Sequence, residues 1–420
     1  MVSEQQALIS IGEVVSASEK LKGIALRTPL QFNPNLSRQF DCQLWLKRED
    51  LQVVRSYKLR GAYNKMTQFS KAERVQGVVC ASAGNHAQGV AYACQALQVK
   101  GRIFMPIPTP KQKVNKVKSF GGEWVEVMLV GDTFDDAFKA AKEDEVLTGA
   151  VFVHPFNDPA IMAGQATVGM EILADMAQPI DYLFVPVGGG GLAAGIGSYL
   201  SQISPQTRII GVEPAGAPAM YQSFQAQEVV SLKQIDKFVD GAAVKRVGEL
   251  TFSICQQTLQ EIALVAEGKV CSTILELYNE EAIVVEPAGA LTLAVLEQYK
   301  KELQGKNVVC VVSGSNNDIM RTEEIKERSL LFEGLKHYFI IRFPQRAGAL
   351  REFLTHVLGP RDDITHFEYT QKNNRERGPA LVGLELENPQ DFDALLARMK
   401  DYGVDYQWLN DDPMLFHLLI

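Results

Sequence analysis

Short runs of apolar and β-branched residues alternate with segments of helical periodicity up to about residue 320. The apolar runs lie at residues 77–81, 102–105, 124–128, 182–187, 209–212 and 308–312. Between them, residues 84–99 place Ala87, Ala91 and Cys94 on one stripe, which predicts a helix with one buried face. Strands that are apolar on both faces and alternate with helices indicate a mostly parallel, twisted sheet covered on both sides, in the α/β class.

The pattern changes after the charged segment at residues 321–328, and the remainder predicts a separate α+β module. Its second helix is expected to have Asn388 as its N-cap and Pro389 at its first position, and to end before Gly403. The order βαββαβ is the split-βαβ, ferredoxin-like arrangement. We expect domains at residues 1–330, with two α/β subdomains, and at residues 335–420. The expected strands lie at residues 337–343, 364–369, 380–386 and 414–420, and the first helix at residues 349–357.

Composition narrows the class of function. The chain has 420 residues, 46% of them hydrophobic, and a net charge of −8. Such a balance argues against a nucleic-acid partner, and no apolar run reaches the ~18 residues that suggest a membrane span. The six cysteines form no CxxC pair and fit a reduced core. These features favour small-molecule chemistry in the cytoplasm.

Lys58 is the first candidate for catalysis. It lies in the segment RSYKLRGA at residues 55–62, close in sequence to Lys47 and Arg48. An amine that forms a Schiff base must be uncharged part of the time, and nearby positive charges would lower the pKa of Lys58. The alternative is a solvated lysine on an amphipathic helix.

A second candidate segment follows the first expected strand. Its backbone N–H groups, at the start of a helix, could bind the carboxylate of a substrate. The alternative is that Asn85 only caps that helix. The segment consists of Ser82, Ala83, Gly84, Asn85 and His86.

A third segment is rich in glycine and could cradle a phosphate with its backbone N–H groups. The same residues also fit the G-x-G-x-x-A dinucleotide fingerprint, with Glu213 at the end of the next strand. Four successive glycines suit one phosphate better than a pyrophosphate, but the local pattern leaves both ligands open. The segment consists of Gly188, Gly189, Gly190, Gly191 and Leu192.

These three segments, in this order, resemble the pyridoxal-phosphate enzymes of fold-type II, the tryptophan-synthase-β-like family, over roughly residues 10 to 320. The resemblance implies that Lys58 binds pyridoxal 5′-phosphate, that Asn85 donates to its 3′-oxygen, and that residues 188–192 bind its phosphate. Ser313, in SGSN at residues 313–316, resembles the residue that bonds the pyridine nitrogen. Glu286 matches a family motif near the cofactor, although it could instead pair structurally with an arginine.

Within this family the chain resembles the isoleucine-regulated threonine dehydratases. Related serine racemases have a serine at the place of Ala83 and a metal-binding carboxylate at the place of Ala219, so neither racemisation nor a metal is expected. The segment FPQRAGAL at residues 343–350 resembles ACT-like regulatory domains. The resemblance implies that L-threonine is deaminated to 2-oxobutyrate and ammonia, with Lys58 also acting as base, that isoleucine inhibits, and that the chain forms a homo-oligomer, dimer or tetramer.

Four other functions stay open at this point. Two lie within the family: a dehydratase that accepts serine as well as threonine, and another fold-type II lyase. The others are an NAD-dependent dehydrogenase that uses the glycine fingerprint and a non-catalytic amino-acid sensor. Lys58 separates these best, because a dehydrogenase has no use for it and a sensor would be expected to have lost parts of the set.

Overall fold

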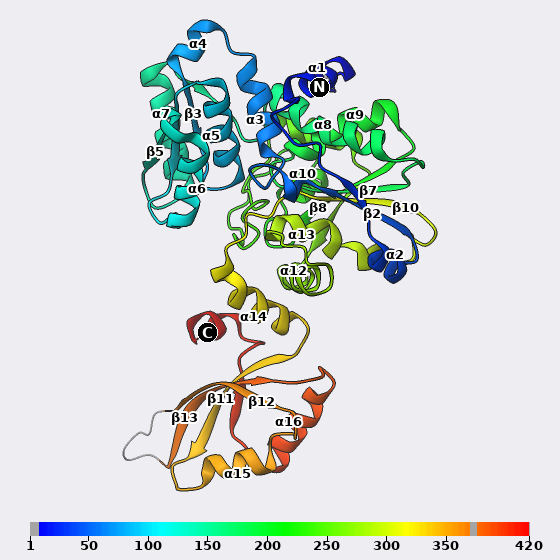
Figure 1. Ribbon diagram of the computed structural model, residues 1–420. Helices are drawn as coiled ribbons and strands as arrows, with labels where there is room; N and C mark the ends of the chain where they lie inside the picture. Colours follow the sequence, from blue (N-terminus) through cyan, green and yellow to red (C-terminus); the bar gives the residue numbers. More distant parts are fainter. Residues whose placement is uncertain (1–7, 370–375, 420) are drawn as a thin grey trace. The chain divides into compact units, whose positions relative to one another are not determined.

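The computed structural model describes residues 8–369 and 376–419. It divides into two units, one that ends at Asp318 and one that begins at Ile319 (Figure 1). Helix α14 (Thr322–Phe332) belongs to the second unit, whereas most of it falls within the first domain, residues 1–330, expected from the sequence. Among the described residues, no helix combines the length and apolar content that crossing a membrane requires.

The first unit contains two sheets. The larger has the order β1-β2-β10-β7-β8-β9, and all its neighbours are parallel except the β1/β2 pair. The smaller has the order β5-β4-β3-β6 and is entirely parallel. The strands are β1 (Leu30–Phe32), β2 (Gln43–Arg48), β3 (Val78–Ala81), β4 (Gly101–Met105), β5 (Val125–Leu129), β6 (Val151–Phe152), β7 (Tyr182–Pro186), β8 (Arg208–Pro214), β9 (Glu261–Val265) and β10 (Asn307–Val312).

Helices cover the sheets of the first unit. Helices α8 and α9 lie on one side of the larger sheet, and α12 and α13 lie on the other (Figure 1). The helices are α1 (Ile11–Leu21), α2 (Pro34–Phe40), α3 (Lys58–Thr67), α4 (Lys71–Gln76), α5 (Asn85–Leu97), α6 (Lys111–Gly121), α7 (Phe134–Thr148), α8 (Pro159–Asp175), α9 (Gly191–Ile203), α10 (Ala219–Ala226), α11 (Glu249–Thr258), α12 (Glu267–Glu281) and α13 (Pro287–Ala294). Short 3₁₀ turns occur at Glu49–Leu51, Gly122–Trp124, Leu296–Tyr299 and Ile319–Arg321.

The six predicted strands of this unit are all present, and the parallel α/β class is confirmed. Every residue of β7 and all but the first of β10 are buried, because helices cover both faces of the sheet. The prediction missed β1, β2, β6 and β9. The six cysteines are free and buried, as predicted.

The second unit is built on an antiparallel sheet with the order β12-β13-β11-β14. Placing the first strand between the third and fourth is the ferredoxin-like topology that the sequence predicts. Its core contains the fully buried Phe339, Val382 and Leu395. The elements are β11 (Lys336–Pro344), α15 (Ala349–His356), β12 (Asp363–Tyr369), β13 (Arg377–Glu385), α16 (Asp391–Asp401), β14 (Tyr406–Trp408) and α17 (Pro413–Leu419).

Two details predicted for this unit are wrong. The expected last strand at residues 414–420 is helix α17 as far as Leu419, and Ile420 lies outside the described residues. The fourth strand is instead β14, where Trp408 pairs with Phe339. Helix α16 begins at Asp391 after Gln390, so Asn388 is not its side-chain cap. Its end is as predicted, since Gly403 has a φ of +66° just past the helix.

Candidate active site

Three loops with candidate residues follow the carboxyl ends of parallel strands. Strands β7 and β10 are neighbours in the larger sheet, so the loop that starts at Gly188 and the loop that starts at Ser313 open at one edge. The loop at residues 82–86 follows β3 of the smaller sheet. Ligands of open parallel sheets bind at such edges.

Lys58, the first residue of α3, lies beside the loop after β10. Ser56 forms a backbone bridge with Gly314, and the N–H of Tyr57 donates to the carbonyl of Ser313 at 3.4 Å. The Lys58 Nζ donates to the carbonyl of Pro155 at 3.3 Å. The amine is therefore placed between the carboxyl ends of the two sheets.

Burial lowers the pKa of Lys58 to about 8, and the negative charge of Glu286 partly opposes that shift. The predicted direction is confirmed, but the predicted cause, repulsion by neighbouring cations, is wrong. Lys47 is ion-paired with Glu171 at 2.6 Å, and Arg48 is paired with Asp50 at 2.7 Å. These ion pairs compensate the charges of Lys47 and Arg48, so the two cations have little effect on the Lys58 amine.

Arg60, in the same segment, has a structural role. Its guanidinium is buried and pairs with Glu49 at 2.8 Å and with Glu171 at 2.7 Å. Burial alone would raise the pKa of Glu49, but the charge and hydrogen bonds of Arg60 lower it. This pairing ties α3 to the 3₁₀ turn after β2 and to α8, and so fixes the helix that begins at Lys58.

The loop at residues 82–86 faces the start of α3. At Gly89, one turn into α5, a side chain would press on the backbone N of Leu59 at 3.0 Å, so the two helices approach closely here. Ser82, Ala83, Gly84 and Asn85 are partly exposed, whereas His86 is buried and contacts the carbonyl of Val153 at 2.8 Å. Burial lowers the pKa of His86 to about 3, so its ring is neutral.

Asn85 does not cap α5. The N-cap is Gly84, and the Asn85 side chain is bound instead to the residue before α13 and to a residue of the loop after β10. Its Nδ2 donates to Glu286 Oε1 at 2.6 Å, and its Oδ1 accepts from Asn316 Nδ2 at 2.7 Å. Glu286 thus pairs with two asparagines, and the structural arginine pair considered for it is wrong.

The glycine loop is packed too tightly for side chains. A Cβ at Gly189 would overlap the ring of Phe156, and one at Gly190 would lie 2.7 Å from Met220. Gly190 also has a φ of +90°, which strains any other residue. The hydroxyl of Thr251 donates to the Gly189 carbonyl at 2.6 Å and fixes the loop.

Glu213 does not play the part that a dinucleotide site would give it. Its buried carboxylate accepts the backbone N–H groups of Met220 at 2.9 Å and Tyr221 at 2.8 Å, at the start of α10. Burial raises the pKa of Glu213 to about 8. Glu213 is fully buried and faces α10, so it is not presented to a ribose. Among the described residues, no group of three or more metal-ligating side chains could hold a metal ion.

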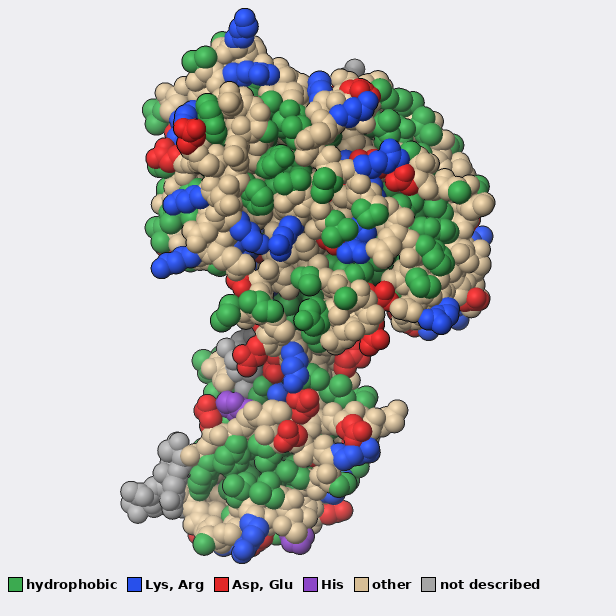
Figure 2. All heavy atoms as spheres, in the orientation of Figure 1, with side chains coloured by type: hydrophobic (Ala, Val, Ile, Leu, Met, Phe, Trp, Pro, Cys, Tyr) green, Lys and Arg blue, Asp and Glu red, His purple; other side chains and the backbone are tan. Residues whose placement is uncertain are grey.

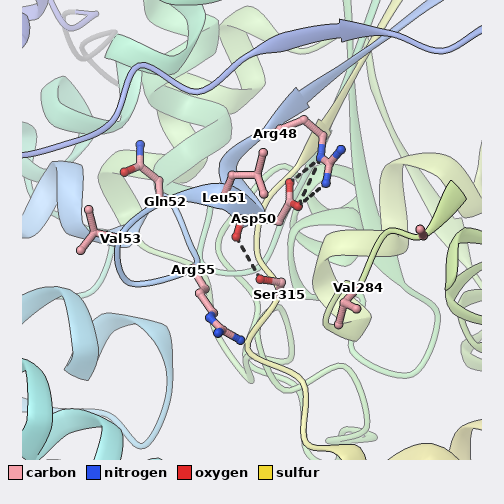
Figure 3. Close-up of a pocket in the computed structure, with 9 residues that line it drawn as sticks. Arg48, Asp50, Leu51, Gln52, Val53, Arg55, Val284 and Ser315 are labelled. Carbon is pink, nitrogen blue, oxygen red and sulfur yellow. Dashed lines mark hydrogen bonds and ion pairs between the residues drawn. The ribbon is translucent and has the colours of Figure 1, made fainter.

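Ser313 is buried at the end of β10, and its hydroxyl donates to the Ala288 carbonyl at 3.2 Å. Two residues on, the hydroxyl of Ser315 donates to the Asp50 carbonyl at 2.9 Å. Behind this loop is a cavity of about 380 Å³, where Asp50 lies between Arg48 and Ser315 (Figure 3). The Ser313 loop is therefore held from behind by buried polar contacts.

Sequence reasoning missed the segment at residues 154–157. Phe156 lies against Gly189 and Gly191, and the Asn157 Oδ1 accepts the backbone N–H of Leu250 at 3.0 Å. His154 Nδ1 accepts the N–H of Asn157 at 2.8 Å and closes the turn. The segment follows β6, whose two residues are too short a run to be recognised as a strand.

A second cavity, of about 490 Å³, lies in the second unit. Residues of the FPQRAGAL segment line it together with two aromatic residues of β12. Figure 2 shows hydrophobic side chains gathered on the visible face of this unit. The lining includes Phe343, Arg346, Leu350, Arg351, Phe367 and Tyr369.

Known families match both units. The profile described as pyridoxal-phosphate dependent enzyme matches residues 21–314, and that described as C-terminal regulatory domain of threonine dehydratase matches residues 327–419. The biosynthetic L-threonine dehydratase of Halalkalibacterium halodurans is 57% identical over 98% of this chain and 99% of its own. That of Bacillus subtilis is 56% identical over 99% of both. The chain belongs to the biosynthetic L-threonine dehydratases.

Solved structures agree with this membership. The dehydratase is 37% identical to the processed form of threonine deaminase isoform 2 from Solanum lycopersicum, with a TM-score of 0.73 over 79% of this chain and 92% of that chain. It is 34% identical to the threonine deaminase of T.th., with a TM-score of 0.69 over 74% of this chain and 99% of that chain. The predicted family, pyridoxal phosphate cofactor and C-terminal regulatory domain are confirmed, and a nicotinamide dehydrogenase is excluded.

Proposed function

We propose that this dehydratase converts L-threonine to 2-oxobutyrate and ammonia at a site built around Lys58. The observation that carries the proposal is the convergence of one partly buried amine with the ends of β3, β7 and β10. The lowered pKa of Lys58 supports it, because a neutral amine is available both to bind an aldehyde and to take a proton.

The residues present fit pyridoxal phosphate. The loop of Gly188, Gly189, Gly190, Gly191 and Leu192 leaves no room for side chains but exposes backbone at the start of α9, which suits a single phosphate. Asn85 would bind the 3′-oxygen of the cofactor, and the neutral hydroxyl of Ser313 would face its pyridine nitrogen. The Ser313 carbonyl accepts from the N–H of Tyr57, next to Lys58, and the Lys58 amine donates to Pro155, which precedes the Phe156 that packs on the glycine loop.

The chemistry follows from these positions. Bound pyridoxal phosphate supplies a sink for the electron pair left when the Cα proton of threonine is removed. Lys58 Nζ takes that proton as general base. The backbone N–H groups of Ala83, Asn85 and His86 bind the threonine carboxylate, because the N–H of Ser82 already donates to the Phe104 carbonyl and that of Gly84 to the Ser82 hydroxyl. The β-hydroxyl takes up a proton and leaves as water while the Cα electron pair forms a Cα=Cβ double bond. The released enamine tautomerises to an imine, and a second water hydrolyses the imine C=N bond to give 2-oxobutyrate and ammonia.

Isoleucine is the proposed effector of the second unit. The cavity near Leu350 combines aromatic and aliphatic walls with Arg346 and Arg351, which fits an apolar side chain and a carboxylate. The Arg346 guanidinium forms a bidentate ion pair with the Glu352 carboxylate, at 2.6 and 2.7 Å. A homo-oligomer and a cytoplasmic location remain expectations from the sequence.

Labelling of the cofactor lysine tests the assignment directly. Reduction of the purified protein with borohydride makes the link between cofactor and lysine permanent. We expect peptide mapping by mass spectrometry to find the pyridoxyl group on Lys58 and the visible absorption of the lysine-bound cofactor to disappear. A label on Lys47 or Lys116 would contradict the assignment.

Ser313→Asp is expected to change the reaction rather than only slow it. A carboxylate beside the pyridine nitrogen would keep the ring protonated and strengthen the electron sink. We expect a shifted absorption spectrum and a larger share of side products such as transaminated cofactor, measured by chromatography.

The matched control for that variant is Ser315→Asp, which buries a carboxylate in the same loop at a residue that bonds Asp50 instead. We expect the Ser315→Asp variant to be less stable than the unmodified enzyme and to give the same product ratio. Equal spectra and product ratios for Ser313→Asp and the unmodified enzyme would remove Ser313 from the ring-partner position.

A further inference from the structure

Glu286, Asn85 and Asn316 form one hydrogen-bonded chain next to the proposed cofactor site. Glu286 precedes α13, Asn85 opens α5, and Asn316 follows β10, so three separate elements meet here. The Asn85 Nδ2 donates to Glu286 Oε1 at 2.6 Å, and Asn316 Nδ2 donates to Asn85 Oδ1 at 2.7 Å. This series of hydrogen bonds links the part of the unit built on the smaller sheet to the part built on the larger one.

These contacts determine which way the Asn85 amide points. Asn316 Nδ2 also donates to the Val54 carbonyl at 2.9 Å, which fixes it as a donor towards Asn85. A flipped Asn85 amide would place N–H against N–H on one side and oxygen against carboxylate on the other. Only one N–H of Asn85 Nδ2 is bound to Glu286, and the second is left for a ligand.

Glu286 itself has little freedom. Only 4% of it is exposed, and its second oxygen accepts the backbone N–H of Asn316 at 3.2 Å. A Cβ at Gly314 would overlap its carboxylate, and one at Gly241 would lie 3.3 Å from it. The two glycines therefore allow the backbone to enclose the carboxylate in one position.

We propose that Glu286 and Asn316 are positioning residues, which orient the Asn85 amide so that its free N–H binds the cofactor's 3′-oxygen. The proposal rests on the assignment of Lys58 and Asn85 as cofactor contacts. Both act through Asn85 and need not touch the substrate.

The orientation is held most firmly when Glu286 is ionised, because protonation turns one oxygen into an O–H donor and weakens it as an acceptor. Burial and the charge of Asp240 raise the pKa of Glu286 to about 7. The acceptor pair is thus complete above this pH and is lost as the pH falls through it. The other titratable groups whose charges interact with Glu286 are Tyr57, Lys58, Lys113 and Lys116.

Glu286→Gln tests the proposal with almost no change in shape. A glutamine must direct an N–H against either the Asn85 amide or the Asn316 N–H, so one of the two contacts that hold the Asn85–Asn316 pair becomes repulsive. We expect pyridoxal phosphate to bind about tenfold or more weakly, the loss typical of a charged hydrogen bond, with a shifted absorption band. In the unmodified enzyme, cofactor affinity should rise as the pH increases through about 7, where Glu286 ionises. This pH dependence should be absent in Glu286→Gln. Titration of apoenzyme with the cofactor on both sides of pH 7 measures these changes.

Glu213→Gln is the matched control. Glu213 is also a buried glutamate with both oxygens on backbone N–H groups, but it holds the start of α10. Its variant should lower the unfolding temperature and leave the cofactor's absorption band in place. If Glu286→Gln does not fold, Asn316→Ala carries the test, because it removes the donor to Asn85 Oδ1 and should shift the band in the same way.

Asn85→Ala separates the two possible failures. If it shifts the band while Glu286→Gln and Asn316→Ala both keep normal cofactor affinity and spectrum, the positioning role is overturned and the site assignment stands. If Asn85→Ala itself leaves the affinity and spectrum unchanged, Asn85 does not contact the cofactor. The site assignment of Asn85 and the positioning role of Glu286 and Asn316 are then both wrong. A shift in all three variants supports the chain from Glu286 to the cofactor.

Discussion

Lys58→Ala is expected to reduce 2-oxobutyrate formation by more than about ten-thousand-fold, because one side chain provides both the covalent link and the base. The fold should persist. The amine makes a single long hydrogen bond, to Pro155 at 3.3 Å, and removing a partly buried cation relieves a cost of burial. Single-turnover assays with excess cofactor measure the rate, and thermal unfolding measures the stability.

Lys65→Ala is the control for that experiment. Lys65 lies in the same helix and forms an ion pair with Asp158 at 2.7 Å, but it is outside the three loops of the site. Its variant should retain near-normal turnover. Residual turnover by Lys58→Ala at the level of Lys65→Ala would show that another group takes the Cα proton.

Much of the catalytic unit could be predicted because its signals are local. Buried parallel strands are continuous apolar runs, so the ends of β3, β7 and β10 were visible in the sequence, and the loops after them bear Asn85, Gly188 and Ser313. The loops after β7 and β10 meet because these neighbouring parallel strands end at one edge of the larger sheet. The loop after β3 belongs to the smaller sheet, so its approach to the other two did not follow from the predicted strands.

The parts that could not be predicted depend on contacts between distant segments. The pKa of Lys58 is lowered by burial, while the expected cause, flanking cations, is cancelled by partners such as Glu171, more than a hundred positions away. Likewise, the partner of Glu286 is Asn85 on another element. Periodicity and spacing carry no information on such pairs.

The end of the chain shows the same limit for secondary structure. Residues 414–419 are apolar and short, so strand and helix patterns fit equally well. Pairing with β11 selected the three residues of β14 instead, through Phe339 and Trp408. Once that edge of the sheet was filled, the last apolar segment formed α17. Tertiary contacts decided an assignment that local preference left open.

A chain that ends at Asp318 is expected to retain 2-oxobutyrate formation and to lose inhibition by isoleucine. All the proposed cofactor contacts lie in the first unit, and the proposed effector cavity lies in the second. A solved threonine deaminase that matches 74% of this chain over 99% of its own length supports independent folding of the catalytic part. Turnover measured against isoleucine concentration should change from a decreasing curve to a flat one.

A pair of full-length variants tests the same point without removing the unit. Leu350 and Leu354 lie on α15 and are 39% and 43% exposed, but only Leu350 lines the cavity. Leu350→Asp should raise the isoleucine concentration needed for half inhibition by about fivefold or more, within the usual range of allosteric coupling. Leu354→Asp should leave it unchanged. The proposed inhibition requires isoleucine to bind a low-activity state better than the active one. A truncated chain that stays folded and fully sensitive would therefore place the effector in the catalytic unit.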